Sequence, residues 1–303
     1  MKLSDILALL LLAALWGDSF LLMRVAAPVL NPVWLIEMRV LLAGLALLPF
    51  LIRSNLWGEV RQRSVQLFVV GCINLALPFL LFAFAAIHLP AGFSSILNAT
   101  SPLFGTVVAA IWFQEKLTIR GIVGLALGFA GVTILIGVNT LETTPAFLTA
   151  TAAGLMGALL YAIAAPYAKQ QLSGVSPLVT ATISQLSAAI FLLPVLPFTV
   201  PQAIPKPRIL LSVLALAFFS TALAYIFYFR LIQNIGSTKA LTVTYLIPIF
   251  AVVWGRLFLQ EPITSSMIFG CSLILIGTAI AVAKAEVKHG KTSSPFPPDR
   301  RHR

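Results

Sequence analysis

Charged residues are scarce in this chain. Only 10% of its 303 positions are Asp, Glu, Lys or Arg, whereas hydrophobic residues make up 59% and the mean hydropathy is +1.00. An ordinary soluble domain carries roughly 25% charged residues, with which it covers its surface. This composition excludes a soluble globular protein, and lipid is the expected solvent for most of the surface.

Cysteine and histidine are also rare. The two cysteines, Cys72 and Cys271, each lie in an apolar run, so the sequence has no disulfide framework and no CxxC metal pattern. It has no Ser/His/Asp grouping, HExxH, phosphate-binding loop or GxGxxG after a plausible strand. We therefore expect no enzyme activity, no cofactor and no bound metal.

Long uncharged runs are the main feature that is present. No Asp, Glu, Lys or Arg occurs between Ser64 and Gln114, and Gly121–Leu141, Thr143–Ala168 and Ile209–Phe229 are uncharged stretches of single-span length. At about 20 residues per span, the chain accommodates about ten spans. We predict an all-α integral membrane protein with ten transmembrane helices, covering residues 3–23, 32–52, 65–87, 91–113, 119–138, 147–168, 177–197, 208–232, 238–259 and 264–284. Residues 285–303 are expected to form a disordered cytoplasmic tail.

The basic residues are distributed unevenly between the loops. With the amino terminus inside, 15 of the 20 Lys and Arg residues fall on the cytoplasmic side and four on the outer side. This bias predicts that both termini are cytoplasmic, in the plasma or inner membrane. Because the formal charge of +11 resides in loops and the tail, it does not indicate a nucleic-acid partner. The expected partners are a small-molecule substrate and membrane lipid, and the sequence leaves the oligomeric state open.

The sequence contains an internal repeat. A shift of 146 residues overlays 102–138 on 248–284, and a shift of 145 overlays the second predicted span on the seventh. The first overlay matches Pro102 with Pro248, Gln114-Glu115 with Gln260-Glu261, and Gly124 with Gly270. We therefore expect two five-helix repeats, 1–140 and 145–284. An odd number of spans in each makes them point oppositely through the membrane, which is typical of transporters with a substrate site between the halves.

Several motifs resemble a known family. They are Leu15-Trp16-Gly17, Arg39, Ser101-Pro102 and Gln114-Glu115-Lys116-Leu117-Thr118 in the first repeat, and Leu246-Ile247-Pro248 and Leu259-Gln260-Glu261-Pro262-Ile263-Thr264 in the second. Together they resemble the EamA-type permeases of the drug/metabolite transporter superfamily, over about residues 3–284. The resemblance implies a helical basket with a central cavity and alternating access, commonly exporting amino acids, other metabolites or drugs. The family commonly has Gly before the repeated Glu, where this chain has Gln114 and Gln260.

Three ionisable residues lie within predicted spans. Asp18, Glu37 and Arg39 are costly in hydrocarbon, so each should face a cavity or a partner. Asp18 and Arg39 lie at similar depths below the outer ends of their predicted helices, which favours Asp18, and then Glu37, as the partner of Arg39. The pair has two interpretations: an ion pair that holds two spans together, or a substrate site in which Asp18 and Glu37 provide proton coupling. Arg24 is expected to anchor the interface, and Glu115 and Glu261 to form turns and caps.

Polar and aromatic residues inside the spans complete the candidate site. They line the central cavity or bond between helices. The substrate-binding candidates are Trp16, Asp18, Arg39, Asn74, Asn98, Tyr161, Gln185, Tyr225, Tyr228 and Tyr245. The leading hypothesis is a secondary transporter that exports small solutes. A sugar-phosphate or nucleotide-sugar translocator of the same superfamily and a channel or receptor are the alternatives.

The topology can be tested directly. With both termini cytoplasmic, the loop at 139–147, which has no Lys or Arg, should be external. Reporter fusions at the termini and within this loop, or labelling of single cysteines, should place them on opposite sides of the membrane. A cytoplasmic 139–147 loop would contradict the span count.

Overall fold

The computed structural model describes residues 2–112, 114, 116–137, 144–201 and 205–282, and all regular secondary structure in that part of the chain is helical. The first half contains α1 (Leu3–Leu30), α2 (Pro32–Ser54), α3 (Trp57–Gln62), α4 (Ser64–Val70), η1 (Gly71–Ala76), α5 (Leu77–His88), α6 (Ala91–Asn98), α7 (Ser101–Trp112) and α8 (Ile119–Gly137). The second half contains α9 (Pro145–Gln171), α10 (Pro177–Leu192), η2 (Leu193–Phe198), α11 (Pro207–Ala217), η3 (Phe218–Leu223), α12 (Ala224–Ile235), α13 (Ser237–Ala240), α14 (Val243–Leu259) and α15 (Ser265–Val282).

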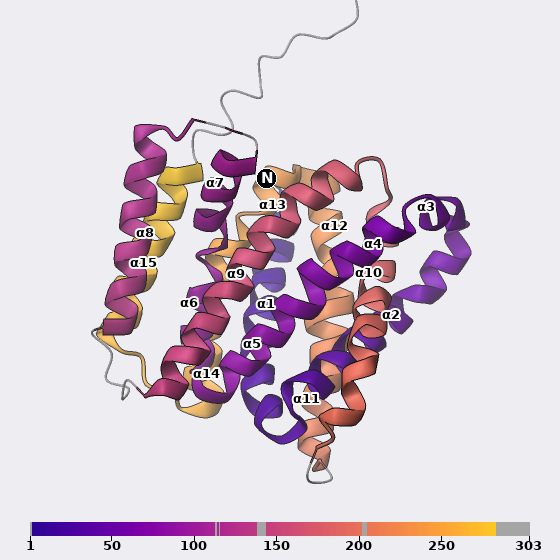
Figure 1. Cartoon of the computed structure of the whole chain (residues 1–303), viewed down its shortest axis with the longest axis horizontal. Coiled ribbons are helices and arrows are strands. Elements are labelled where there is room, and N and C mark those ends of the chain that lie inside the picture. The colour runs from indigo at the N-terminus through magenta and orange to yellow at the C-terminus, as the bar shows by residue number, and fades with distance from the viewer. Residues whose placement is uncertain (1, 113, 115, 138–143, 202–204, 283–303) are drawn as a thin grey trace, which may run out of the picture.

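The helices cross the bundle ten times. In the described residues, nine helical segments are long and apolar enough to span a membrane, and the shorter apolar helix α14 makes the tenth passage. This confirms the predicted ten-helix all-α membrane fold. Figure 1 shows that the start of α1 and the end of α15 lie at the same end of the bundle, which we call the terminal face. The far face is the opposite end, where α1 ends and α15 begins. The proposed tail, 285–303, lies outside the described residues.

Proline and capping residues begin several of these helices. Pro32, Pro145, Pro177 and Pro207 occupy the first turn, where a missing backbone N–H removes no helical bond. The Asn31 side chain accepts a hydrogen bond from the Val33 N–H at 3.0 Å and so caps α2. These signals explain why the second, sixth, seventh and eighth spans begin close to their predicted positions.

The first span is longer than predicted. The charge at Arg24 suggested an end at Met23, but α1 continues for seven more residues to Leu30. The continuation is apolar except for Arg24, whose donors find acceptors within the protein (below). The predicted end was therefore wrong, and Arg24 lies within a helix rather than beyond one.

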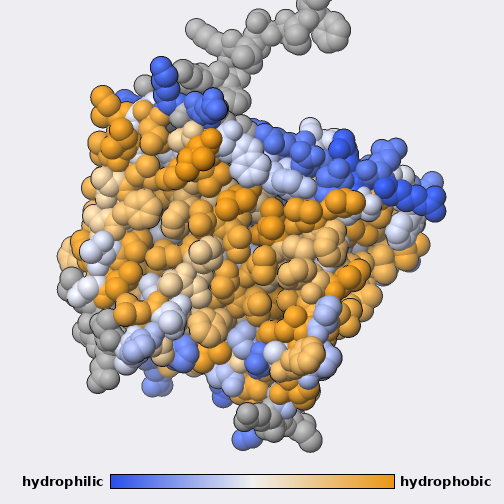
Figure 2. Space-filling model, in the orientation of Figure 1, coloured by the Kyte–Doolittle hydropathy of each residue, from blue (hydrophilic) through white to orange (hydrophobic). Residues whose placement is uncertain are grey.

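The surface has the character that a membrane requires. Figure 2 shows a broad hydrophobic belt between two more hydrophilic ends. Helices α8 and α15 lie side by side at one edge of the bundle and contribute exposed apolar side chains such as Ile122, Phe129, Ile268 and Phe269. Their backbones approach closely, because a Cβ on Gly277 would lie 2.5 Å from the Gly124 carbonyl oxygen. The small residues of these helices therefore serve packing rather than transport.

Each half contains one π-helical segment within a span. The segments are η1, between α4 and α5, and η3, between α11 and α12, and they lie one repeat apart in the sequence. A π turn inserts an extra residue into a helix and is often found at functional sites. Thr221 in η3 and Asn74 in η1 occupy matching positions in the two segments. The π segments therefore direct attention to the surroundings of these two polar side chains.

Candidate functional site

Arg39 is buried near the centre of the bundle. Its side chain is on α2, and the residue is only 3% exposed. The Nε–H donates to the Thr221 hydroxyl oxygen at 3.0 Å, and Nη1 lies 3.8 Å from the Met23 sulfur. The guanidinium carbon sits 3.6 Å from the centroid of the Phe79 ring. A hydroxyl, a thioether and an aromatic face therefore hold the charge, and each is neutral.

The π segment η3 positions the hydroxyl. Thr221 donates its own proton to the Leu216 carbonyl oxygen at 2.8 Å, five residues earlier. Its oxygen is thereby fixed to accept from Arg39. Both Thr221 and Arg39 are buried, so this contact joins α2 of the first half to η3 of the second away from water.

Aromatic side chains gather around Arg39. The Trp16 ring centroid lies 6.4 Å from that of Tyr225 and 5.2 Å from that of Tyr228. Tyr161 stacks on Phe82 at 6.0 Å. Tyr161 and Tyr225 are close enough to the guanidinium to interact with it electrostatically. Five of the predicted site residues, Trp16, Arg39, Tyr161, Tyr225 and Tyr228, thus belong to one region, which we call the central cluster.

The predicted ion pair of Arg39 with Asp18 or Glu37 is not formed. Asp18 is half-buried, and no hydrogen bond or ion pair joins it to another described residue. The prediction depended on α1 ending at Met23. Because α1 ends at Leu30, Asp18 lies about 18 Å from the far end of its helix, whereas Arg39 lies about 10 Å from the start of α2. The two groups therefore do not share a depth.

Glu37 is also separate from Arg39. It lies two residues earlier on α2, so its side chain points away around the helix. The residue is 4% exposed, and its Oε2 atom has no hydrogen-bond partner among the described residues. A buried carboxyl oxygen without a partner is unusual, because burial of a polar group without a hydrogen bond is costly.

The remaining candidates are Gln185, Asn74, Asn98 and Tyr245. Gln185 on α10 is fully buried, and both its amide nitrogen and its amide oxygen lack partners in the described structure. Asn74 and Asn98 are half-buried, and no hydrogen bond from their side chains to described residues is present. Tyr245 on α14 is half-buried.

Sequence reasoning missed four residues of the central cluster. Met23, Phe79, Phe82 and Thr221 all contact predicted site residues, yet three of them are ordinary apolar residues in a sequence full of them. Only Thr221 could have been identified from the sequence, because it belongs to a pair of polar residues, Ser-Thr, inside an uncharged run. Its match to Asn74 would also have become visible in an overlay of the third and eighth spans.

The helix that carries Tyr225 and Tyr228 is packed differently along its length. On the far-face side, α11 packs against both α1 and α2. On the terminal-face side, α12 packs against α1 and α13, and its Tyr225 and Phe229 side chains pack against a cluster that includes Ala43 and Leu47 of α2 and Ala181 of α10.

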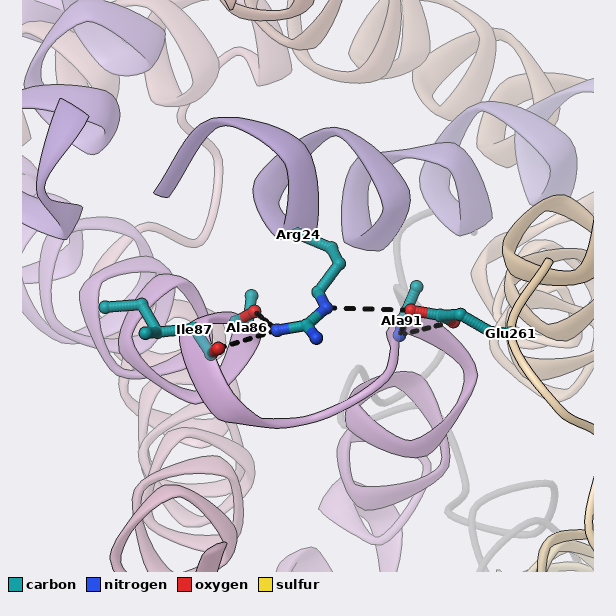
Figure 3. A network of polar contacts seen from close by, with 5 residues as sticks. All are labelled: Arg24, Ala86, Ile87, Ala91 and Glu261. Carbon is teal, nitrogen blue, oxygen red and sulfur yellow. Dashed lines mark hydrogen bonds and ion pairs between the residues drawn. The ribbon is translucent and has the colours of Figure 1, made fainter. Parts of the chain in front are cut away.

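A second polar network lies at the far face and includes Arg24. Figure 3 shows Arg24 on α1 reaching the end of α5, where Nη1 donates to the carbonyl oxygens of Ala86 and Ile87 at 2.8 and 2.6 Å. Its Nε lies 3.7 Å from Oε1 of Glu261. Arg24 is therefore a structural link between helices, and the expectation of a simple interfacial anchor was wrong.

Glu261 links three segments. The Ala91 N–H at the start of α6 donates to both carboxylate oxygens, at 3.2 and 3.0 Å. Burial raises the pKa of Glu261, and the Ala91 N–H and Arg24 both oppose that rise. The expected capping role of Glu261 is confirmed, but the capped helix is α6 of the other half.

The turn after α14 presents Glu261 to this network. Gln260 adopts a left-handed conformation with φ of 55°, and the Glu261 N–H donates back to the Gly255 carbonyl oxygen at 3.1 Å. Gln114, its equivalent in the first half, has φ of 53°. Gly255 leaves room for the Glu261 carboxylate, because a Cβ there would collide with Oε2.

Sequence comparison agrees with this architecture. The chain matches the EamA-like transporter family twice, over residues 3–137 and 148–283. The chain belongs to this family. One solved crystal structure has the same fold with a TM-score of 0.66 at 17% sequence identity, covering 96% of this chain and all of that one.

Several relatives of this EamA-like protein are named as transporters or exporters. An uncharacterized transporter of Archaeoglobus fulgidus is 22% identical, over 92% of this chain and 98% of the relative. A probable terminal-alkyne amino-acid exporter of Streptantibioticus cattleyicolor is 25% identical, over 97% of this chain and 99% of the relative. The uncharacterized transporter YvbV of Bacillus subtilis is 25% identical, over 95% and 94%.

The left-handed turn predicts that Gln260→Gly stabilises this EamA-like protein. Glycine adopts positive φ without the Cβ clash that an L-residue suffers there, so the free energy of unfolding should rise by about 1 kcal/mol. Gln114→Gly should act in the same direction. Thermal unfolding of the purified protein in detergent measures the effect.

The matched control is Gln233→Gly, which changes an exposed residue inside α12. In a helix interior glycine should destabilise the protein by up to about 1 kcal/mol. A lower melting temperature for Gln260→Gly would contradict the account of the turn.

Proposed function

We propose that this protein is a secondary transporter that exports amino acids or other small metabolites and drugs across the cytoplasmic membrane by alternating access. The observation that carries the proposal is the burial of Arg39 among neutral partners, between α2 of one half and η3 of the other. A buried cation without a carboxylate is costly. Such a site gains most from a ligand that brings a negative charge.

The chemistry of the central cluster supports a solute with one carboxylate and an apolar body. The carboxylate would accept from the guanidinium, in a charge-assisted hydrogen bond. The rings of Trp16, Tyr225 and Tyr228 offer apolar surface with hydroxyl or indole groups at the edge. The amide nitrogen and oxygen of Gln185, which lack partners in the described structure, offer a further donor and acceptor inside the bundle. The Streptantibioticus relative, named as a probable amino-acid exporter, favours the same class of solute.

A sugar-phosphate translocator is less well supported. Recognition of a phosphate generally requires more than one cation. The described side chains around Arg39 that contact its guanidinium are neutral. The packing of α11 against both α1 and α2 favours a pathway that is closed on one side. It therefore does not support the alternative of an open channel.

The two halves supply the proposed mechanism. Inverted five-helix halves, 1–140 and 145–284, would rock about the central cluster and expose it to each side in turn. We propose that both termini are cytoplasmic, which makes the terminal face the inner one.

Arg39→Ala should lower the transport of carboxylate-bearing solutes by at least about tenfold, because an interaction with a charged partner is lost. Uptake of labelled amino acids into proteoliposomes that contain the purified protein measures this. Arg39→Lys should retain part of the activity, since the charge remains but the planar fork is lost.

The control for this series is Arg256→Ala, which removes an exposed arginine from α14 and should leave uptake unchanged. Size-exclusion profiles identify variants that fail to fold. Unchanged amino-acid uptake in a folded Arg39→Ala protein would contradict the proposed role of Arg39.

The second prediction concerns coupling to protons. We propose Glu37 as the coupling group, with Asp18 as the alternative, because Glu37 is the more deeply buried and has an unpartnered oxygen. Glu37→Gln should flatten the pH dependence of uptake, since an amide cannot gain or lose the proton. The measurement compares initial rates across a pH series for Glu37→Gln, Asp18→Asn and Glu59→Gln, the last being a control carboxylate on the short helix α3 outside the spans. A pH profile identical to the wild type in both span variants would exclude proton coupling through either carboxylate.

A further inference from the structure

The Arg24–Glu261 network lies at the edge of an open cleft at the far face. The cleft has a volume of about 490 Å³, and Arg24, Arg208 and Glu261 provide its charged groups. Its apolar wall includes Ile87, Ile209 and Leu259. These three side chains also pack in the hydrophobic core that contains Met23, a contact of Arg39. The cleft and the central cluster are therefore separated by packed apolar side chains.

The network crosses the boundary between the halves. Arg24, Ala86, Ile87 and Ala91 belong to the first half, and Glu261 belongs to the second (Figure 3). If the halves separate at the far face, the hydrogen bonds from Ala91 to Glu261 and the ion pair with Arg24 must break. The bonds from Arg24 to the end of α5 can remain, because α1 and α5 are on the same side of the boundary.

The contacts are of a kind that can open and close. The ion pair is long, at 3.7 Å, and its side chains are 31% and 14% exposed. Water from the cleft can therefore solvate both charges once they separate, which keeps the cost of opening modest. A fully buried pair would instead leave two desolvated charges.

We propose that Arg24, Glu261 and the Ala91 N–H form the gate that closes the transport pathway at the far face. The inference rests on the proposed alternating access. In the closed gate, Glu261 holds the α14–α15 turn against the start of α6 and against α1. Ile87, Ile209 and Leu259 then pack beneath it, and the central cluster has no path to the far side. Release of Glu261 lets the α14–α15 turn move away, and the apolar layer opens.

The gate can be tested without any solute by measuring the reactivity of a cysteine beneath it. Val213 lies on α11 one turn further in than Ile209, and it is fully buried. A Val213→Cys protein, in a background with Cys72→Ser and Cys271→Ala, is labelled with a membrane-impermeant maleimide. Oriented vesicles expose either the far face or the terminal face to the reagent.

Glu261→Gln and Arg24→Gln should each raise the labelling rate from the far face by about tenfold, as expected from the loss of one charge-assisted hydrogen bond. The matched control is Glu59→Gln. Glu59 also crosses between the halves and accepts a backbone N–H, from Ser176 at 2.6 Å, but at the terminal face. It should leave labelling from the far face unchanged.

Three results would overturn the gate: wild-type labelling rates in both gate variants, an equal rise in Glu59→Gln, or an equal rise from both faces, which indicates general loosening. Should Val213→Cys fail to reach the membrane, Leu216→Cys, also fully buried on α11, serves as the reporter. Because no solute is present, failure to transport any amino acid would contradict the proposed function and leave the labelling result intact.

Discussion

The guanidinium of Arg39 is the constraint on which the centre of this protein depends. In hydrocarbon a fixed charge must find polar or polarisable neighbours, and the fold brings them from five segments. The neighbours are Thr221 of η3, Met23 of α1, Phe79 of α5, Tyr161 of α9 and Tyr225 of α12. None of them neutralises the charge. The packing of α2 against η3 and α5 therefore keeps a buried positive charge without a negative partner among the described contacts, and we propose that a ligand with a carboxylate provides one.

The far-face network also stabilises an arginine charge, but with different partners. Arg24 meets two carbonyl oxygens at the end of α5 and a carboxylate, so its charge is compensated within the protein. The compensation depends on the turn that presents Glu261, and that turn keeps Gln260 in a left-handed conformation. A conformation that is unfavourable for glutamine thus coincides with a contact between the halves, as is common where local strain serves function. The two arginines of the bundle interior differ in this respect: one is paired and lies at a face, and the other is unpaired and lies at the centre.

Membership of the EamA-like transporter family agrees with this division of roles. The family match covers both halves, so the central cluster and the far-face network each draw residues from both matched segments. The curated relatives share about a quarter of their residues with this chain, which leaves the solute open. We propose that the rings of Trp16, Tyr161, Tyr225 and Tyr228 and the amide of Gln185 determine which solute is bound.

The amino-acid sequence by itself determined the ten helices and identified Arg39 as a charge inside a span. Hydrocarbon cannot satisfy the backbone, so long uncharged runs must form helices, and a charge within such a run must have a reason. Only the tertiary structure decided the partners. Whether Arg24 ends α1 or lies inside it depends on carbonyl groups 62 and 63 residues away, at the end of α5. Because α1 extends seven residues beyond its predicted end, Asp18 does not lie at the depth of Arg39. The hydrogen-bond partner of Arg39 is instead Thr221, on the π segment η3. Hydropathy is a property of each stretch of chain, whereas the pairing of charges depends on how helices far apart in sequence are packed together.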